Sequence, residues 1–212
     1  MLVKNVMTKN PVTISPESSI TEAKALMTKK NIGKLPVIDK NNNLVGIITK
    51  KDLAKAAPSE ATTLDMFEIG YLLSKIKVEK IMTKKVVSVP ESEVVENAAK
   101  LMVDNGIGCV PVMSGDCLVG IITESDLFQL FTDMFGSRDS GVRFILTLDD
   151  TPGQLAKLVN EIAKENGNLV SLVTRELKEA GKRRLTVKVA GITEAQLKEI
   201  LARLNIVADD IR

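Results

Sequence analysis

A threonine followed three residues later by an aspartate stands at two places in the chain, each time directly after an apolar run. The pairs are Thr49 with Asp52 and Thr123 with Asp126. A hydroxyl and a carboxylate at this spacing form a capping box, which satisfies free N–H groups at the start of a helix. The same groups could instead bind a nucleotide, because a helix start favours phosphate and a carboxylate accepts hydrogen bonds from ribose. One copy alone favours the cap, whereas the matched pair favours the nucleotide.

The two residues that follow each threonine differ in charge between the copies. They are Lys50 and Lys51 in the first copy and Glu124 and Ser125 in the second. Lysines attract a polyphosphate and a glutamate repels it, so we expect the first copy to prefer ATP over AMP more than the second copy does. If these side chains point into solvent instead, salt screening removes most of the difference.

Several kinds of chemistry are excluded by residues that the chain lacks. There is no histidine among its 212 residues, which removes the commonest general base and metal ligand and any Ser-His-Asp or Cys-His arrangement. No Walker loop, nucleophile elbow or paired-carboxylate motif is present. Cys109 lies in an apolar run, where we expect a buried side chain rather than a reactive thiol. The sequence therefore predicts no enzymatic activity, no catalytic residue and no metal site.

The composition is that of a globular protein with little net charge. Apolar residues make up 44% and charged residues 26%, and 29 basic against 27 acidic residues give a formal net charge of +2. That balance argues against a nucleic-acid partner, which needs a sustained basic surface. No apolar run approaches the ~20 residues of a membrane span, and the first residues do not resemble a signal peptide. Since two cysteines are too few for a disulfide framework, we expect a cytoplasmic chain without a membrane partner.

An internal repeat is the most informative feature of the sequence. Segments of the first part of the chain recur 74 or 75 positions later, in the same order. The matching segments are 6–9 and 81–84, 16–18 and 90–92, 32–37 and 107–112, and 44–49 and 118–123. Because so many ordered matches do not arise by chance, one structural unit has been duplicated.

Each unit is predicted to contain a strand, a helix, two strands and a second helix. The elements expected in the first unit are a strand over 11–14, a helix over 19–30, strands over 35–38 and 44–49, and a helix that opens at Lys50. The second unit follows the same plan from 86 to 131. Between the units we expect a helix over 64–76 with Asp65 as its N-cap.

A second domain is expected after a linker at 136–141. Its predicted elements are a strand over 142–148, a helix opened by Pro152 with Gln154 in a capping box, strands over 169–176 and 183–189 around a turn at Ala180, a helix capped by Thr193 and a strand over 206–210. The order βαββαβ is typical of a ferredoxin-like domain.

The duplicated motifs resemble a tandem pair of CBS domains (a Bateman module) over residues 1–135, with repeat one at 1–57, a linker helix at 58–77 and repeat two at 78–135. The resemblance implies that an adenine-containing ligand such as AMP, ATP or S-adenosylmethionine binds in the cleft between the repeats. It places Asp52 and Asp126 at the ribose and Thr49 and Thr123 at phosphate, with the base-binding strand of each site supplied by the other repeat. The further residues that it implies at the nucleotide are Val12, Thr13, Ile32, Gly33, Lys51, Val87, Ser88, Ile107, Gly108 and Ser125.

Residues 142–212 resemble an ACT domain through the segment that runs from Asp150 to Gly153 and through Asn168. ACT domains typically bind an amino acid at a dimer interface, so the resemblance implies Asp150, Gly153 and Asn168 as effector contacts. Turn chemistry alone explains these residue types as well. The order of domains and the segment between the repeats resemble acetoin-utilisation regulatory proteins of the AcuB type.

The predicted fold is α+β, with two βαββα-type repeats packed as a pair and followed by a ferredoxin-like βαββαβ domain. The predicted function is that of a non-catalytic regulator, which senses an adenine nucleotide in the CBS cleft and transmits the signal to the ACT domain without a required cofactor. A ligand-free dimerisation scaffold and a small enzyme are the alternatives. We expect a homodimer, because a four-stranded sheet with helices on one face leaves an edge that a second copy can cover.

Overall fold

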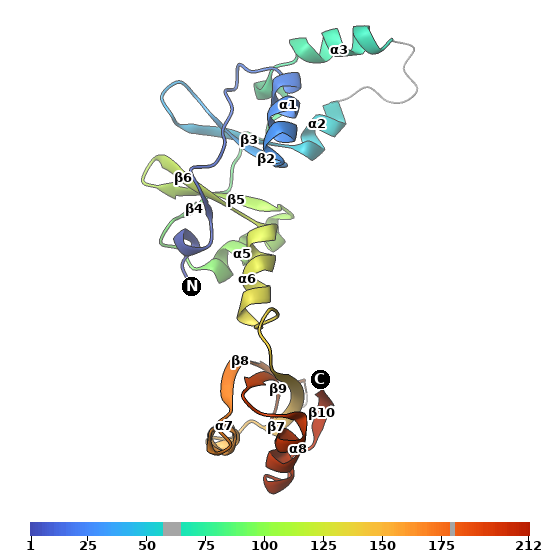
Figure 1. The fold of residues 1–212 in the computed structure, drawn as a ribbon. Helices are drawn as coiled ribbons and strands as arrows, with labels where there is room; N and C mark the ends of the chain where they lie inside the picture. Colours follow the sequence, from blue (N-terminus) through green and yellow to red (C-terminus); the bar gives the residue numbers. More distant parts are fainter. Residues whose placement is uncertain (57–64, 179–180) are drawn as a thin grey trace. The chain divides into compact units, whose positions relative to one another are not determined.

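The computed structural model describes residues 1–56, 65–178 and 181–212 (Figure 1). The last residue of the predicted first repeat (57), the start of the predicted linker segment (58–64) and Ala180 of the predicted turn lie outside the described residues. The chain divides into two compact units, Met1–Leu127 and Phe128–Arg212. Helix α6 (Glu124–Met134) carries residues of both units, so the division falls within a helix rather than at the expected linker.

Repeat one is built on a two-stranded antiparallel sheet, β2 (Lys34–Ile38) and β3 (Leu44–Thr49). Helix α1 (Ile20–Lys30) begins after its N-cap Ser19, and α2 (Lys50–Ala56) follows β3 without a loop. These four elements confirm the sequence prediction. Side chains of repeat one, together with Val78 from the segment between the repeats, bury one apolar cluster, which consists of Ile14, Ala23, Met27, Leu35, Val37, Ile48 and Val78.

The β-prone run 11–14 does not form the predicted strand. Only Ile14 is paired, in a single parallel bridge to Val37. Pro11 has no amide hydrogen to donate to a ladder, and the two residues that follow it make no backbone hydrogen bond with a described residue. The corresponding residues 86–88 in the second repeat are unpaired in the same way. The prediction was wrong because a β-prone run needs a free neighbouring edge as well as the right side chains.

Repeat two follows the same plan, with one further short strand. Its elements are β4 (Val89–Pro90), α5 (Val95–Asn105), β5 (Cys109–Ser114), β6 (Cys117–Thr123) and the first turns of α6. Between the repeats lie α3 (Met66–Lys75) and α4 (Val78–Ile81), and Asp65 caps α3 as predicted. Within the described ranges, no helix combines the length and the apolar character needed to cross a bilayer.

The two repeats exchange their first segments. A short 3-10 turn (Val3–Asn5) leads into β1 (Thr8–Lys9), which pairs with β6 of repeat two and completes the sheet β1-β6-β5-β4. In return, the backbone of Thr83, near the start of repeat two, exchanges hydrogen bonds of 2.9 and 3.0 Å with the backbone of Ile47 in repeat one. Because each repeat completes the sheet of the other, neither repeat is a closed unit by itself.

Methionine–glycine contacts fix this exchange. The side chain of Met7 lies where a Cβ atom of Gly120 would stand, and the side chain of Met82 lies in the same relation to Gly46. Only glycine leaves room for such a side chain against the strand. The contacts explain why the Met-Thr segment and the Leu-Val-Gly segment both recur in the sequence.

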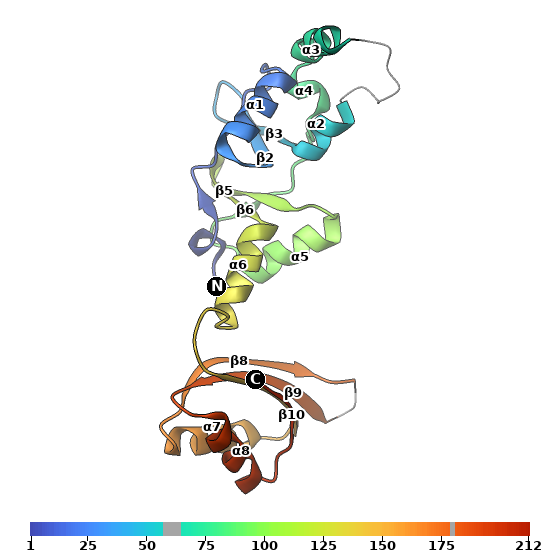
Figure 2. The same ribbon diagram turned by 45° about the vertical axis from the view of Figure 1, so that its right-hand side comes forward.

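The second unit is a four-stranded antiparallel sheet with two helices on one face (Figure 2). The strand order is β10-β7-β9-β8, which confirms the ferredoxin-like βαββαβ prediction. The strands are β7 (Val142–Asp149), β8 (Asn168–Glu176), β9 (Lys182–Ala190) and β10 (Ala208–Ile211), and the helices are α7 (Gln154–Lys164) and α8 (Glu194–Arg203). Thr193 and Gln196 form the predicted capping box of α8. Phe144, Leu158 and Leu197 are fully buried between the layers.

Two details of this domain differ from the prediction. Helix α7 begins at Gln154 after the N-cap Gly153, whose φ is 89°, so Pro152 is not the first helical residue and no capping box forms. Gly153 adopts a left-handed backbone conformation, which would be strained in a residue with a side chain. The helix thus begins at this turn and not at the predicted capping box. The last strand begins at Ala208 instead of residue 206, because Asn205 turns the chain with φ 53°.

Candidate functional site

The Thr49–Asp52 pair forms the predicted capping box at the start of α2. The Oδ2 atom of Asp52 accepts from the backbone amide of Thr49 at 2.9 Å and from its hydroxyl at 2.7 Å. The amide of Asp52 donates back to the threonine hydroxyl at 3.3 Å. Among the described residues nothing donates to the second oxygen, Oδ1, which is therefore free to accept from a ligand hydroxyl.

The Thr123–Asp126 pair repeats this geometry at the start of α6. The three distances are 2.8, 2.7 and 3.4 Å. Both aspartates are half-buried. The capping role and the ligand role are therefore compatible at each copy, because each role uses a different carboxylate oxygen.

A cavity of about 510 Å³ lies between the repeats on the side of Asp52. That volume is within the range of small-molecule sites. The residues from repeat one that line it are Gly33, Lys34, Ile47, Thr49, Lys50, Lys51, Asp52 and Lys55. The residues from the second half of the module are Thr83, Lys85, Val86, Val87, Gly106, Ile107, Gly108, Cys109, Pro111 and Glu124. Seven of the residues that the resemblance implied meet here: Thr49, Lys51, Asp52, Gly33, Val87, Ile107 and Gly108.

Residues with unpaired backbone groups line the same cavity as Asp52. The amide and carbonyl groups of Val86 and Val87 make no hydrogen bond with any described residue. A backbone amide and a carbonyl side by side can pair with the edge of a base, as a strand edge pairs with a peptide. Val12 and Thr13 have the same free backbone groups in the first repeat. The acceptor carboxylate and the free backbone thus come from different repeats.

Lys34 ties the two halves of the cavity together. Its Nζ atom donates to the carbonyl oxygen of Gly108 at 2.5 Å, across a separation of 74 residues. The carboxylate of Glu124 also lies over Gly108. Burial raises the pKa of the neighbouring Cys109 thiol to about 11, an effect that Lys34 opposes and Glu124 adds to. Cys109 is thus a buried, protonated side chain of the cavity wall, as predicted.

The remaining implied residues do not line this cavity. Ser88 borders a separate surface hollow with Lys84 and Asn43. The others are outside its lining too, namely Val12, Thr13 and Ile32 of repeat one and Thr123, Ser125 and Asp126 of the second Thr-Asp copy. Glu124 differs from the expectation, because it lines the Asp52 cavity together with Lys50 instead of marking only the second copy. Lys34, Lys55 and Lys85 also line the cavity. They could not be predicted from the sequence, because a lysine is by its charge alone expected on a solvated surface.

The three implied contacts of the ACT domain are not brought together within one chain. Asp150 accepts two hydrogen bonds of 2.9 Å from Arg183, which hold the pKa of that carboxyl below its usual range. Asn168 pairs with Ala190, at the other end of β9. Nine residues of β9 separate the two ends, about 27 Å in an extended strand. Asp150 and Asn168 of one chain are therefore too far apart to contact one small effector together, and the effector contacts at a dimer interface stay a prediction.

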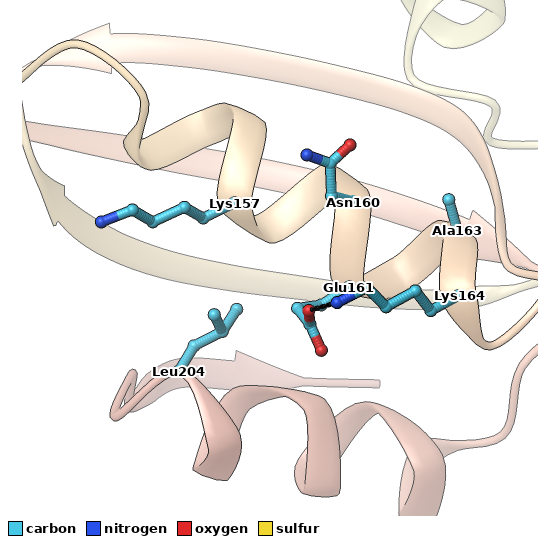
Figure 3. A pocket seen from close by; sticks show the side chains of 6 residues that line it. All are labelled: Lys157, Asn160, Glu161, Ala163, Lys164 and Leu204. Atoms are coloured by element: carbon cyan, nitrogen blue, oxygen red, sulfur yellow. Dashed lines mark hydrogen bonds and ion pairs between the residues drawn. The ribbon is translucent and has the colours of Figure 1, made fainter.

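A shallow groove lies between α7 and α8 of the same domain (Figure 3). Its lining comprises Lys157, Asn160, Glu161, Ala163, Lys164 and Leu204. Glu161 is paired with Lys164 at 2.5 Å and with Arg203 at 3.5 Å. Because its central carboxylate is already neutralised, the groove offers a ligand less than the cavity at Asp52 does.

Comparison with known proteins agrees with this geometry. The family model described as "CBS domain" matches residues 3–59 and 78–133, which together make up more than half of the chain. The chain belongs to the CBS-domain family. A second model, described as "TTHA0829-like ACT domain", matches residues 140–212. The chain is thus a CBS-domain pair followed by an ACT domain, and both are regulatory modules.

Solved structures of CBS pairs are similar over the first part of the chain. The CBS domain pair of protein MJ0100, in complex with 5′-methylthioadenosine and S-adenosyl-L-methionine, is 35% identical, with a TM-score of 0.53 over 66% of this chain and 98% of that one. A putative acetoin utilization protein (AcuB) from Vibrio cholerae is 29% identical, with a TM-score of 0.54 over the same shares. CBSX2 in complex with AMP is 30% identical, with a TM-score of 0.50 over 61% of this chain and 95% of that one.

Three of the curated relatives each match about 60% of this chain. The L-aspartate semialdehyde sulfurtransferase of Methanocaldococcus jannaschii is 37% identical over 61% of this chain and 23% of its own length. The chain spans about a quarter to a third of the length of the first curated relatives that it matches. Where these relatives have enzyme names, most of their length therefore lies outside the region that they share with this chain.

Proposed function

We propose that the chain is a non-catalytic regulator which binds an adenosine-containing ligand in the cavity at Asp52. The observation that carries the proposal is the meeting of a free carboxylate oxygen from repeat one with the unpaired backbone of Val86 and Val87 from repeat two. A ribose hydroxyl can donate to the first, and the adenine edge, with one donor and one acceptor, can pair with the second. The CBS pairs of similar structure that hold AMP, S-adenosylmethionine or methylthioadenosine support this choice.

Helix α6 gives the ligand signal a route towards the ACT domain. It begins at the Thr123–Asp126 capping box and runs without a break to Met134. The segment that follows it is held by the ACT sheet, since Lys188 donates to the carbonyls of Gly136 and Asp139 and the buried Ser171 donates to Phe135. A ligand that shifts the start of α6 would therefore displace a segment bonded to β8 and β9.

A second copy of the chain is part of the proposal. Phe128, Phe131 and Met134 of α6 are more than half exposed, which is unusual for such side chains unless a partner covers them. A twofold partner would also be able to bring Asp150 of one chain near Asn168 of the other, so that both contact one amino acid. Light scattering should give about twice the chain mass of 23.0 kDa. A monomer at micromolar concentration would contradict both the homodimer and an effector site shared by two chains.

Calorimetric titration of the full chain with AMP and with GMP tests the proposed ligand. The two nucleotides differ at the base edge alone, so AMP should bind more tightly if Val86 and Val87 read that edge. Equal affinity would mean that the base is not recognised. No binding of adenosine, AMP, ATP or S-adenosylmethionine would favour the alternative, a ligand-free dimerisation scaffold.

A further inference from the structure

Five lysines line the cavity at Asp52, against two carboxylates. The lysines are Lys34, Lys50, Lys51, Lys55 and Lys85, and the carboxylates are Asp52 and Glu124. The cavity wall thus carries three more positive than negative charges. Four of the lysines form no ion pair with a described residue, and the fifth, Lys34, donates to a backbone carbonyl. Cations that converge without partners repel one another, and an anion that enters relieves this repulsion.

None of these lysines has a lysine counterpart in the other repeat. At the repeat offset of 74 or 75 residues, the positions of Lys34, Lys50, Lys51, Lys55 and Lys85 are taken by Cys109, Glu124, Ser125, Gln129 and Asn10. The Thr-Asp box and the free base-facing backbone are present in both repeats. The two copies therefore share the groups that suit a nucleoside and differ in the groups that suit phosphate.

We infer that the Asp52 cavity is a site for a polyphosphorylated nucleoside and that the Asp126 copy is not. This inference rests on the proposed function and adds the ligand class and the number of sites. Triphosphate is preferred to monophosphate because the lysines come from three segments of the wall, the start of β2, helix α2 and the stretch after Thr83, and so surround more than one phosphate position. A cationic sulfonium ligand is disfavoured by the same charges.

Calorimetric titrations of the full chain with adenosine, AMP, ATP and S-adenosylmethionine, at low and at high salt, test the inference. ATP should bind at one site per chain and more tightly than adenosine by about tenfold or more, as expected for two or more partly screened ion pairs. The difference should shrink at high salt. S-adenosylmethionine should bind more weakly than ATP.

The double variant Lys51→Ser, Lys55→Gln places the residues of the second repeat in the first. It should lose most of the preference for ATP and keep the affinity for adenosine. The control variant Lys24→Gln, Lys40→Ser removes the same charge from exposed positions outside the cavity and should behave as the parent chain.

The outcomes separate the inference from the proposed function. If adenosine binds and ATP binds no more tightly, or if ATP fills two equal sites, the inference is wrong while the proposed function stands. A tighter complex with S-adenosylmethionine than with ATP also overturns the inference alone. If none of the four ligands binds, the proposed function itself fails.

Discussion

Asp52 accepts two hydrogen bonds from Thr49 through a single carboxylate oxygen, Oδ2, and leaves Oδ1 without a donor among the described residues. The cap of α2 and the proposed ribose contact thus depend on one side chain but on different atoms of it. A substitution that removes the whole carboxylate cannot tell the two roles apart. A substitution that changes only one oxygen can.

Asp52→Asn should weaken AMP binding by about 1.5–3 kcal/mol, the range for a hydrogen bond to a charged group. The amide oxygen can still accept from Thr49, whereas the amide nitrogen replaces Oδ1 and cannot accept from ribose. Calorimetry measures the affinity, and thermal unfolding shows whether the cap survives. Asp126→Asn makes the same change at the second copy, so it should leave affinity at the Asp52 cavity unchanged. Equal losses in both variants would contradict the assignment.

Gly120→Ala should destabilise the CBS pair by about 1–3 kcal/mol, because the new methyl group would overlap the buried side chain of Met7. Chemical denaturation measures the change. Gly70→Ala, in helix α3 with nothing near the added methyl, is the matched control and should stabilise by up to about 1 kcal/mol. In the double variant Gly120→Ala, Met7→Ala, the loss of unfolding free energy should be smaller than the sum of the losses in the two single variants. Additive costs would show that the exchanged segment does not hold Gly120.

Lys188→Met should loosen the segment between α6 and β7. The variant removes the hydrogen bonds to the carbonyls of Gly136 and Asp139, so amide exchange at 136–139 should accelerate while the buried strands stay protected. Hydrogen exchange followed by mass spectrometry measures this. Lys157→Met removes a charge from α7 and should have no such effect. Unchanged exchange at 136–139 would show that Lys188 does not hold this segment, and would contradict the proposed transmission through it.

The two cysteines should differ sharply towards thiol reagents. At pH 8 one thiol per folded chain should react, the exposed Cys117, because burial raises the pKa of Cys109 to about 11. In the unfolded chain Cys109 ionises at its ordinary, lower pKa, so its contribution to stability is present below about pH 9 and is lost as the pH rises towards about 11. Rapid reaction of both thiols at pH 8 would contradict the buried placement.

Much of the fold could be predicted because its signals are local. The N-cap at Asp65 and the cap at Thr193 each depend on residues within four positions of sequence, and the structure confirms both. The exchange of β1 between repeats could not be predicted. Since both repeats carry the same motifs, the sequence does not say whether Met7 packs on Gly46 of its own repeat or on Gly120 of the other.

The candidate site was predictable only in part, for a related reason. Thr49 and Asp52 carry a recognisable spacing, whereas an exposed lysine has no signal that separates a cavity wall from a solvated face. Lys34 comes next to Thr49 through strand register, and Lys85 reaches the same wall only because Thr83 pairs with Ile47. Both relations depend on tertiary pairing.

A crystal structure of the full chain grown with AMP at about a hundred times its Kd, where nearly all sites are filled, would show where the nucleotide binds. We expect AMP in the cavity between the repeats, with a ribose hydroxyl within hydrogen-bond distance of Asp52 Oδ1 and the adenine edge against the backbone of Val86 and Val87. AMP bound elsewhere, or in this cavity with its ribose turned away from Asp52, would contradict this expectation.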